Sequence, residues 1–144
     1  MKTYFEQKRF TVSTKGQPPP VGVDFQFLIG GGQFGVPALL FNGIEVKPTR
    51  ISNTKADKGA RFFYDLPAVE PGSRATMVCS VDDFNTESNL TPLTMQLRTV
   101  GGAALPIAQS GGNVADDGIV EFSHAQKSFK HGDRVVFDIF LRFS

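Results

Sequence analysis

Apolar side chains recur at every second position in several segments of the chain, a period that is typical of strands with one buried face. The clearest segment spans 134–143, and its apolar face consists of Val135, Phe137, Ile139, Leu141 and Phe143. The same alternation marks 23–29, 74–82 and 93–98, with weaker candidates at 9–14, 38–41, 44–46, 60–66 and 118–123. We predict about eight short strands and no helix longer than a turn or two.

Turn-forming residues separate these segments, since the chain holds 15 glycines and 9 prolines. Asn42-Gly43 is the strongest hairpin signal, because a type I′ turn needs positive φ at both central residues. Many short strands in a chain of 144 residues predict an all-β fold. We expect a two-sheet antiparallel β-sandwich, for which a jelly roll is one compatible topology.

The first 22 residues differ from the rest, because a polar strand candidate is followed there by Pro18-Pro19-Pro20. Consecutive prolines favour a stiff, extended polyproline II segment. We therefore predict an extended N-terminal arm over 1–22 that leads into a β-sandwich body over 23–144.

Charge is balanced over the whole chain but uneven along it. Fifteen basic and 14 acidic side chains leave a net charge of +1, so nucleic acid is not an expected partner. Residues 47–61 are basic, whereas acidic residues gather at 82–87 and 116–121. No apolar run approaches the length of a membrane helix and no export signal is visible at the N-terminus. These features predict a soluble protein without a membrane partner.

Gly30-Gly31-Gly32-Gln33-Phe34-Gly35 matches the G-x-G-x-x-G pattern of dinucleotide-binding loops. The context does not fit, because Val36-Pro37 and another strand candidate follow where the pattern requires a helix. We expect a mobile loop between strands, no cofactor and no small-molecule substrate.

Asp83, Asn85 and Glu87 alternate as oxygen ligands do in a calcium loop, but the central glycine and the distal glutamate of an EF-hand are missing. An ordinary solvated acidic loop is the favoured interpretation, and we expect no metal. His124 and His131 are too few for a typical zinc site and are expected in surface loops. Cys79 lies on the apolar face of a strand candidate, which predicts a buried, inert thiol. No catalytic residues are predicted, and the chain is not expected to be an enzyme.

A binding or structural role remains. An arm and segments of opposite charge suit docking against copies of the same chain or a protein lattice such as a capsid. We expect a small virion component of a bacterial virus, such as a capsid-decorating or cement subunit, assembled in the host cytoplasm. A carbohydrate-binding β-sandwich module is the alternative, and a jelly-roll enzyme comes third. The expected interface residues are Tyr4, Phe5, Phe10, Val12, Lys47, Arg50, Lys55, Lys58, Arg61, Asp82, Asp83, Asp116 and Asp117.

Overall fold

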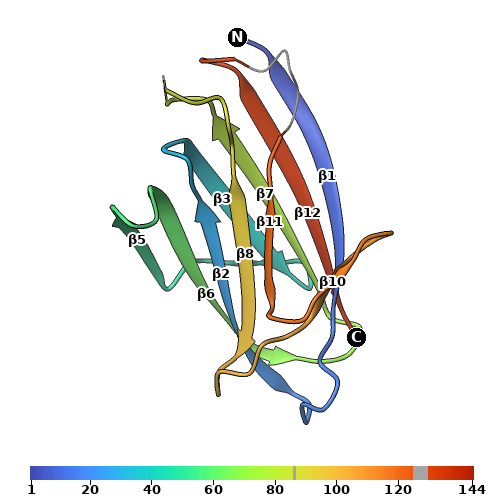
Figure 1. Ribbon diagram of the computed structural model, residues 1–144. Coiled ribbons are helices and arrows are strands. Elements are labelled where there is room, and N and C mark those ends of the chain that lie inside the picture. Colours follow the sequence, from blue (N-terminus) through green and yellow to red (C-terminus); the bar gives the residue numbers. More distant parts are fainter. Residues whose placement is uncertain (86, 125–129) are drawn as a thin grey trace.

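Two β-sheets face each other in the computed structural model of the protein, which describes residues 1–85, 87–124 and 130–144 (Figure 1). The larger sheet has the strand order β10 (Val114–Ala115), β9 (Ile107–Gln109), β1 (Thr3–Val12), β12 (Arg134–Phe143), β7 (Arg74–Asp82), β3 (Phe34–Phe41), β4 (Ile44–Val46). The smaller sheet has the order β11 (Ile119–Phe122), β8 (Leu93–Thr99), β2 (Val21–Ile29), β6 (Gly59–Val69), β5 (Arg50–Thr54). This arrangement confirms the predicted β-sandwich, but its strand order does not show a jelly roll. No helix capable of crossing a membrane occurs in the described residues.

The core lies between the sheets and is built from the alternating apolar positions. On β12, all five side chains of the predicted stripe, from Val135 to Phe143, are at most 2% exposed. β2, β7 and β8 contribute their own alternating faces to the same core. Phe25 and Tyr64 meet edge to face there, with ring centroids 5.9 Å apart. The period-two prediction of buried faces is therefore confirmed.

The predicted hairpin joins β3 to β4. Asn42 and Gly43 both have positive φ, 48° and 82°, and Phe41 pairs with Ile44 across the turn. These values are those a two-residue type I′ turn requires.

The N-terminal segment is not an arm outside the body. β1 lies inside the larger sheet and pairs in parallel with β12 along its whole length, from Thr3 opposite Arg134 to Val12 opposite Phe143 (Figure 1). This is the one parallel pair among the described strands; all others are antiparallel. The expectation of a separate arm was wrong, because alternate side chains of β1 complete the inner face of the larger sheet.

Truncating Phe137 tests the core. Because this side chain is fully buried, Phe137→Ala should lower the free energy of unfolding by about 3 to 5 kcal/mol, as measured by urea denaturation. Phe5→Ala is the matched control, since Phe5 lies on the same sheet but is 74% exposed, and it should cost less than about 1 kcal/mol. Equal losses in the two variants would contradict the assigned inner face.

Candidate functional site

The segments at the two ends of the strand orders lie on opposite sides of the sandwich and carry opposite charge in their own residues, while Arg9 and Arg142 of neighbouring strands line a pocket with Ser110 of the second segment. β4 and β5 end the two sheets on one side, where residues 43–61 hold five basic and two acidic side chains, a net charge of +3. β10 and β11 end them on the other side, where residues 107–122 hold three acidic side chains and no basic one. In Figure 1, β5 lies at the left and β10 at the right. We call these two surfaces the basic edge (43–61) and the acidic edge (107–122).

The turn between β5 and β6 presents two lysines on the basic edge. Arg61 holds the turn by donating from Nε and Nη2 to the two carboxylate oxygens of Asp57, at 3.1 and 3.0 Å. This contact lowers the pKa of Asp57 from its ordinary value. The amide of Asp57 also donates to Thr54 Oγ1, at 3.1 Å. Lys55 and Lys58 are exposed on this fixed turn, whereas the charge of Arg61 is matched within the chain.

The remaining basic residues of the prediction also lie on this side. Lys47 Nζ is 2.8 Å from Glu45 Oε2, an exposed pair in which the two charges offset each other. Arg50 stacks on the ring of Phe63, 3.9 Å from its centroid, and forms no ion pair with the residues that the structure describes. The structure therefore brings all five predicted basic residues to one edge, and Arg50, Lys55 and Lys58 keep their charge available.

A groove of about 870 Å³ opens between β3 and the β5–β6 hairpin on the basic edge. Its apolar lining includes Phe34, Val36, Ile51 and Phe84, which are 60%, 63%, 57% and 70% exposed. At the end of the groove, Gly59 brings the hairpin against β2, because a Cβ there would lie 1.8 Å from the carbonyl oxygen of Ile29. Exposed apolar side chains that gather in one place mark an interaction surface. Sequence reasoning did not find this groove.

Gln33 fixes one wall of the groove. Its Oε1 accepts from the amides of Phe84 and Asn85, at 2.7 and 2.8 Å. Its Nε2 donates to Asp83 Oδ1 at 3.2 Å and to the carbonyl oxygens of Ser88 and Leu90 at 3.0 and 2.8 Å. The glycine-rich segment connects β2 to β3, as expected of a loop between strands, and the buried Gln33 ties it to the chain around Phe84 through five hydrogen bonds.

Two of the three side chains considered for calcium, those of Asp83 and Asn85, make hydrogen bonds within the chain, and Glu87 contributes its backbone amide. The Asp83 side chain is buried against Gln33. Asn85 donates to the carbonyl oxygen of Gly31 at 2.8 Å and accepts from the amide of Glu87 at 2.9 Å. Over the described ranges, no group of three or more histidine, cysteine or acidic side chains is arranged to hold a metal ion.

The other predicted acidic residues separate into two places. Asp82 lies opposite Arg134 on neighbouring strands, and Arg134 Nε is 2.6 Å from its Oδ1, so its charge is matched within the chain. Asp116 and Asp117 are exposed on the acidic edge. Asp117 Oδ1 accepts from the amide of Ile119, at 3.1 Å, which shapes the turn into β11.

The four N-terminal residues predicted for an interface do not form one surface. Phe10 and Val12 are buried in the core, at 4% and 0% exposure, whereas Phe5 points outward from the same strand. Tyr4 is partly buried and packs against His124, with ring centroids 4.9 Å apart. Successive side chains of β1 point to opposite faces of the sheet, so these four residues cannot form one apolar contact surface. The expected interface through the N-terminal residues was therefore wrong.

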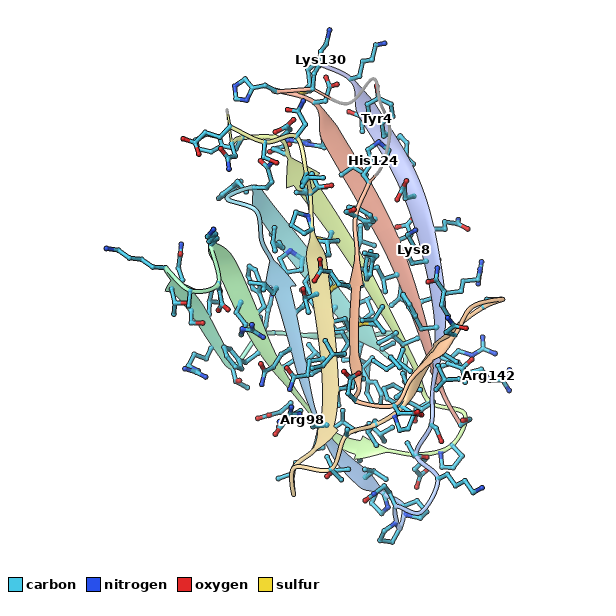
Figure 2. All side chains as sticks on the ribbon, in the orientation of Figure 1. Tyr4, Lys8, Arg98, His124, Lys130 and Arg142 are labelled. Carbon is cyan, nitrogen blue, oxygen red and sulfur yellow. The ribbon has the colours of Figure 1, made fainter. Side chains whose placement is uncertain are left out.

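His124 is not a surface residue, contrary to the prediction. It is 6% exposed, and its Nδ1 lies 2.8 Å from Glu6 Oε1 on β1. Figure 2 shows His124 beside Tyr4, with Lys8 further along the same strand. His131 is exposed, as expected.

In comparisons with known proteins, no family model and no curated protein matches this chain.

The buried Asp83 in the wall of the groove should make the stability of the fold depend on pH, and a substitution at this position tests that dependence. Burial raises the pKa of Asp83 above its ordinary value of 3.8, against the lowering effects of Gln33 and His131. The native state therefore loses stability as the pH rises from 3.8 through the raised pKa, because ionisation is harder in the fold than in the unfolded chain.

Asp83→Asn removes this ionisation and keeps an oxygen that accepts from Gln33. Relative to the original chain, the variant should gain stability as the pH rises from about 3 to about 7, measured by urea unfolding. Asp116→Asn, an exposed position, is the control for the change in net charge. A variant that instead loses relative stability over this range would show that the Asp83 carboxylate is stabilised in the fold.

Proposed function

We propose that this chain is a non-enzymatic structural subunit that assembles with copies of itself or docks on a protein lattice. The observation that carries the proposal is the opposite charge of the two sandwich edges. Opposite charges on opposite sides favour head-to-tail contacts, and such contacts can repeat from copy to copy. Complementary charge also steers encounter and disfavours contacts between like edges.

The charges of the acidic edge are available for such a contact. Asp116, Asp117 and Glu121 are exposed, and none of them takes part in an ion pair within the described part of the chain. On the basic edge, Arg50, Lys55 and Lys58 are likewise without an acidic partner among those residues. Three unmatched charges of each sign therefore face away from each other on one molecule.

We place this subunit in the virion of a bacterial virus, as a capsid-decorating or cement protein. This setting is supported only by the small size of the sandwich and by its two charged edges, which suit repeated contacts in a lattice. The N-terminal strand is part of the body, so the proposed interface keeps only the two edges.

Sedimentation velocity tests the assembly. The intact protein should form species larger than a monomer as its concentration rises, and the association should weaken between about 0.05 and about 0.5 M salt, because the screening length falls below about 5 Å. Mass spectrometry of purified particles tests the virion setting and should find this chain among their proteins. A chain that stays monomeric at low salt and is missing from particles would contradict the proposal. Oligosaccharide binding by such a monomer would favour the carbohydrate-binding alternative.

A further inference from the structure

The groove between β3 and the β5–β6 hairpin lies between two strand edges without neighbours. β5 ends the smaller sheet and pairs only with β6 among the described strands. β4 covers β3 only from Leu39 to Phe41, so the half of β3 from Phe34 to Ala38 has no described strand on that side. Backbone groups on such edges are available to pair with an added strand.

The two edges differ in how well they accept a strand. Pro37 interrupts the open half of β3, because proline has no amide hydrogen to donate. β5 contains no proline from Arg50 to Thr54. Its Ile51 pairs with the buried Phe62 and is itself exposed at the groove. Backbone pairing is therefore favoured along β5, with Ile51 beneath the incoming chain.

The rim of the groove selects for negative charge. Lys55 and Lys58 both line it, and none of the acidic residues that the structure describes does. Asp57, which lies between these lysines in the sequence, is held by Arg61, and Asp83, which precedes the lining residue Phe84, is buried. An occupant must therefore offer apolar side chains to the lining and carboxylates to the rim.

The acidic edge of the chain has both properties. Val114 and Ile119 are 56% and 37% exposed, and Asp116, Asp117 and Glu121 lie beside them in sequence. β11 ends the smaller sheet and pairs only with β8 in the described part of the structure, so it has a free edge of its own. This combination matches the apolar lining and lysine rim of the groove.

We propose that the groove between β3 and β5 binds the segment 114–121 of a second copy of this chain. The inference rests on the proposed assembly function and names the two surfaces that meet. Because groove and segment lie on opposite sides of the sandwich, one copy can use both at once. The contact is heterologous, so it produces rings or open chains of copies rather than a closed two-fold dimer.

Charge reversal on either surface tests the pairing. Lys55→Glu with Lys58→Glu reverses the rim, and Asp116→Lys with Glu121→Lys reverses the segment while leaving Asp117 in its turn. Each double variant should weaken self-association at low salt by at least about tenfold, because like charges then face each other. A 1:1 mixture of the two variants, and the chain that combines all four changes, should associate within about threefold of the intact protein.

A second pair of variants tests the apolar lining. Ile51→Asp places a charge inside the groove, and Ile44→Asp is its matched control, since Ile44 is 72% exposed on neighbouring β4 but does not line the groove. Lys2→Glu with Lys15→Glu is the control for the Lys55→Glu, Lys58→Glu variant, because it changes the net charge equally at exposed positions away from the groove. Circular dichroism and urea unfolding show that each variant is folded before its sedimentation is measured.

The two proposals fail in different ways. If the intact chain associates but the groove variants associate as well as their controls, this site is overturned and assembly stands. The site is also overturned if the fourfold variant and the mixture fail to recover association. If the intact chain stays monomeric under all conditions, self-assembly itself is contradicted and this contact falls with it.

Discussion

A two-sheet sandwich hides its apolar faces by laying one sheet on the other, but its outermost strands still end in water with unpaired backbone groups. The two sides of this molecule meet that constraint differently. On one side, Phe122 of β11 reaches over the larger sheet and contacts Phe10 and Phe137, with ring centroids 5.8 and 5.7 Å apart. On the other side, Ile51 stays exposed at an open groove. The sandwich is filled at one edge and open at the other.

Because only one side of the sandwich has an open groove, the charges beside that groove can determine which partners bind there. An open apolar groove beside a free strand accepts many partners unless something discriminates against the wrong ones. In the proposed contact, Lys55 and Lys58 repel a second groove and attract the acidic edge, while Pro37 removes a donor from one of the two strand edges. On this proposal, the same features favour head-to-tail contacts over indiscriminate pairing of edges.

Local patterns in the sequence predicted the interior well, because a period of two places alternate side chains on one face whatever the strand pairs with. The stripe of β12 and the Asn42-Gly43 turn are examples. Long-range pairing leaves no such local mark. The first 22 residues were predicted to form an arm because a polar strand candidate precedes three prolines. Nothing in them marks the partner β12, which lies more than a hundred residues away, or the contact of Glu6 with His124.

The site was predictable only as two charged segments. Neither segment shows in its own residues that it will end a sheet, or that the two will lie on opposite sides, since strand order decides both. The structural role of Gln33 was also missed, because it lies in a glycine-rich motif that was compared with cofactor-binding loops. In the structure, its side-chain amide makes hydrogen bonds that hold the chain around Phe84.

Engineered cysteines give the most direct test of the contact between groove and segment. Ile51→Cys and Val114→Cys each add one exposed thiol, and the native Cys79 stays unreactive because burial raises its pKa to about 12. Mixed under mild oxidation at low salt, the two variants should form disulfide-linked dimers that contain one of each, seen by non-reducing electrophoresis and mass spectrometry. Each variant alone should cross-link far less. Cross-linking of Ile51→Cys to itself as readily as to Val114→Cys, or no cross-linking in the mixture, would contradict the head-to-tail contact.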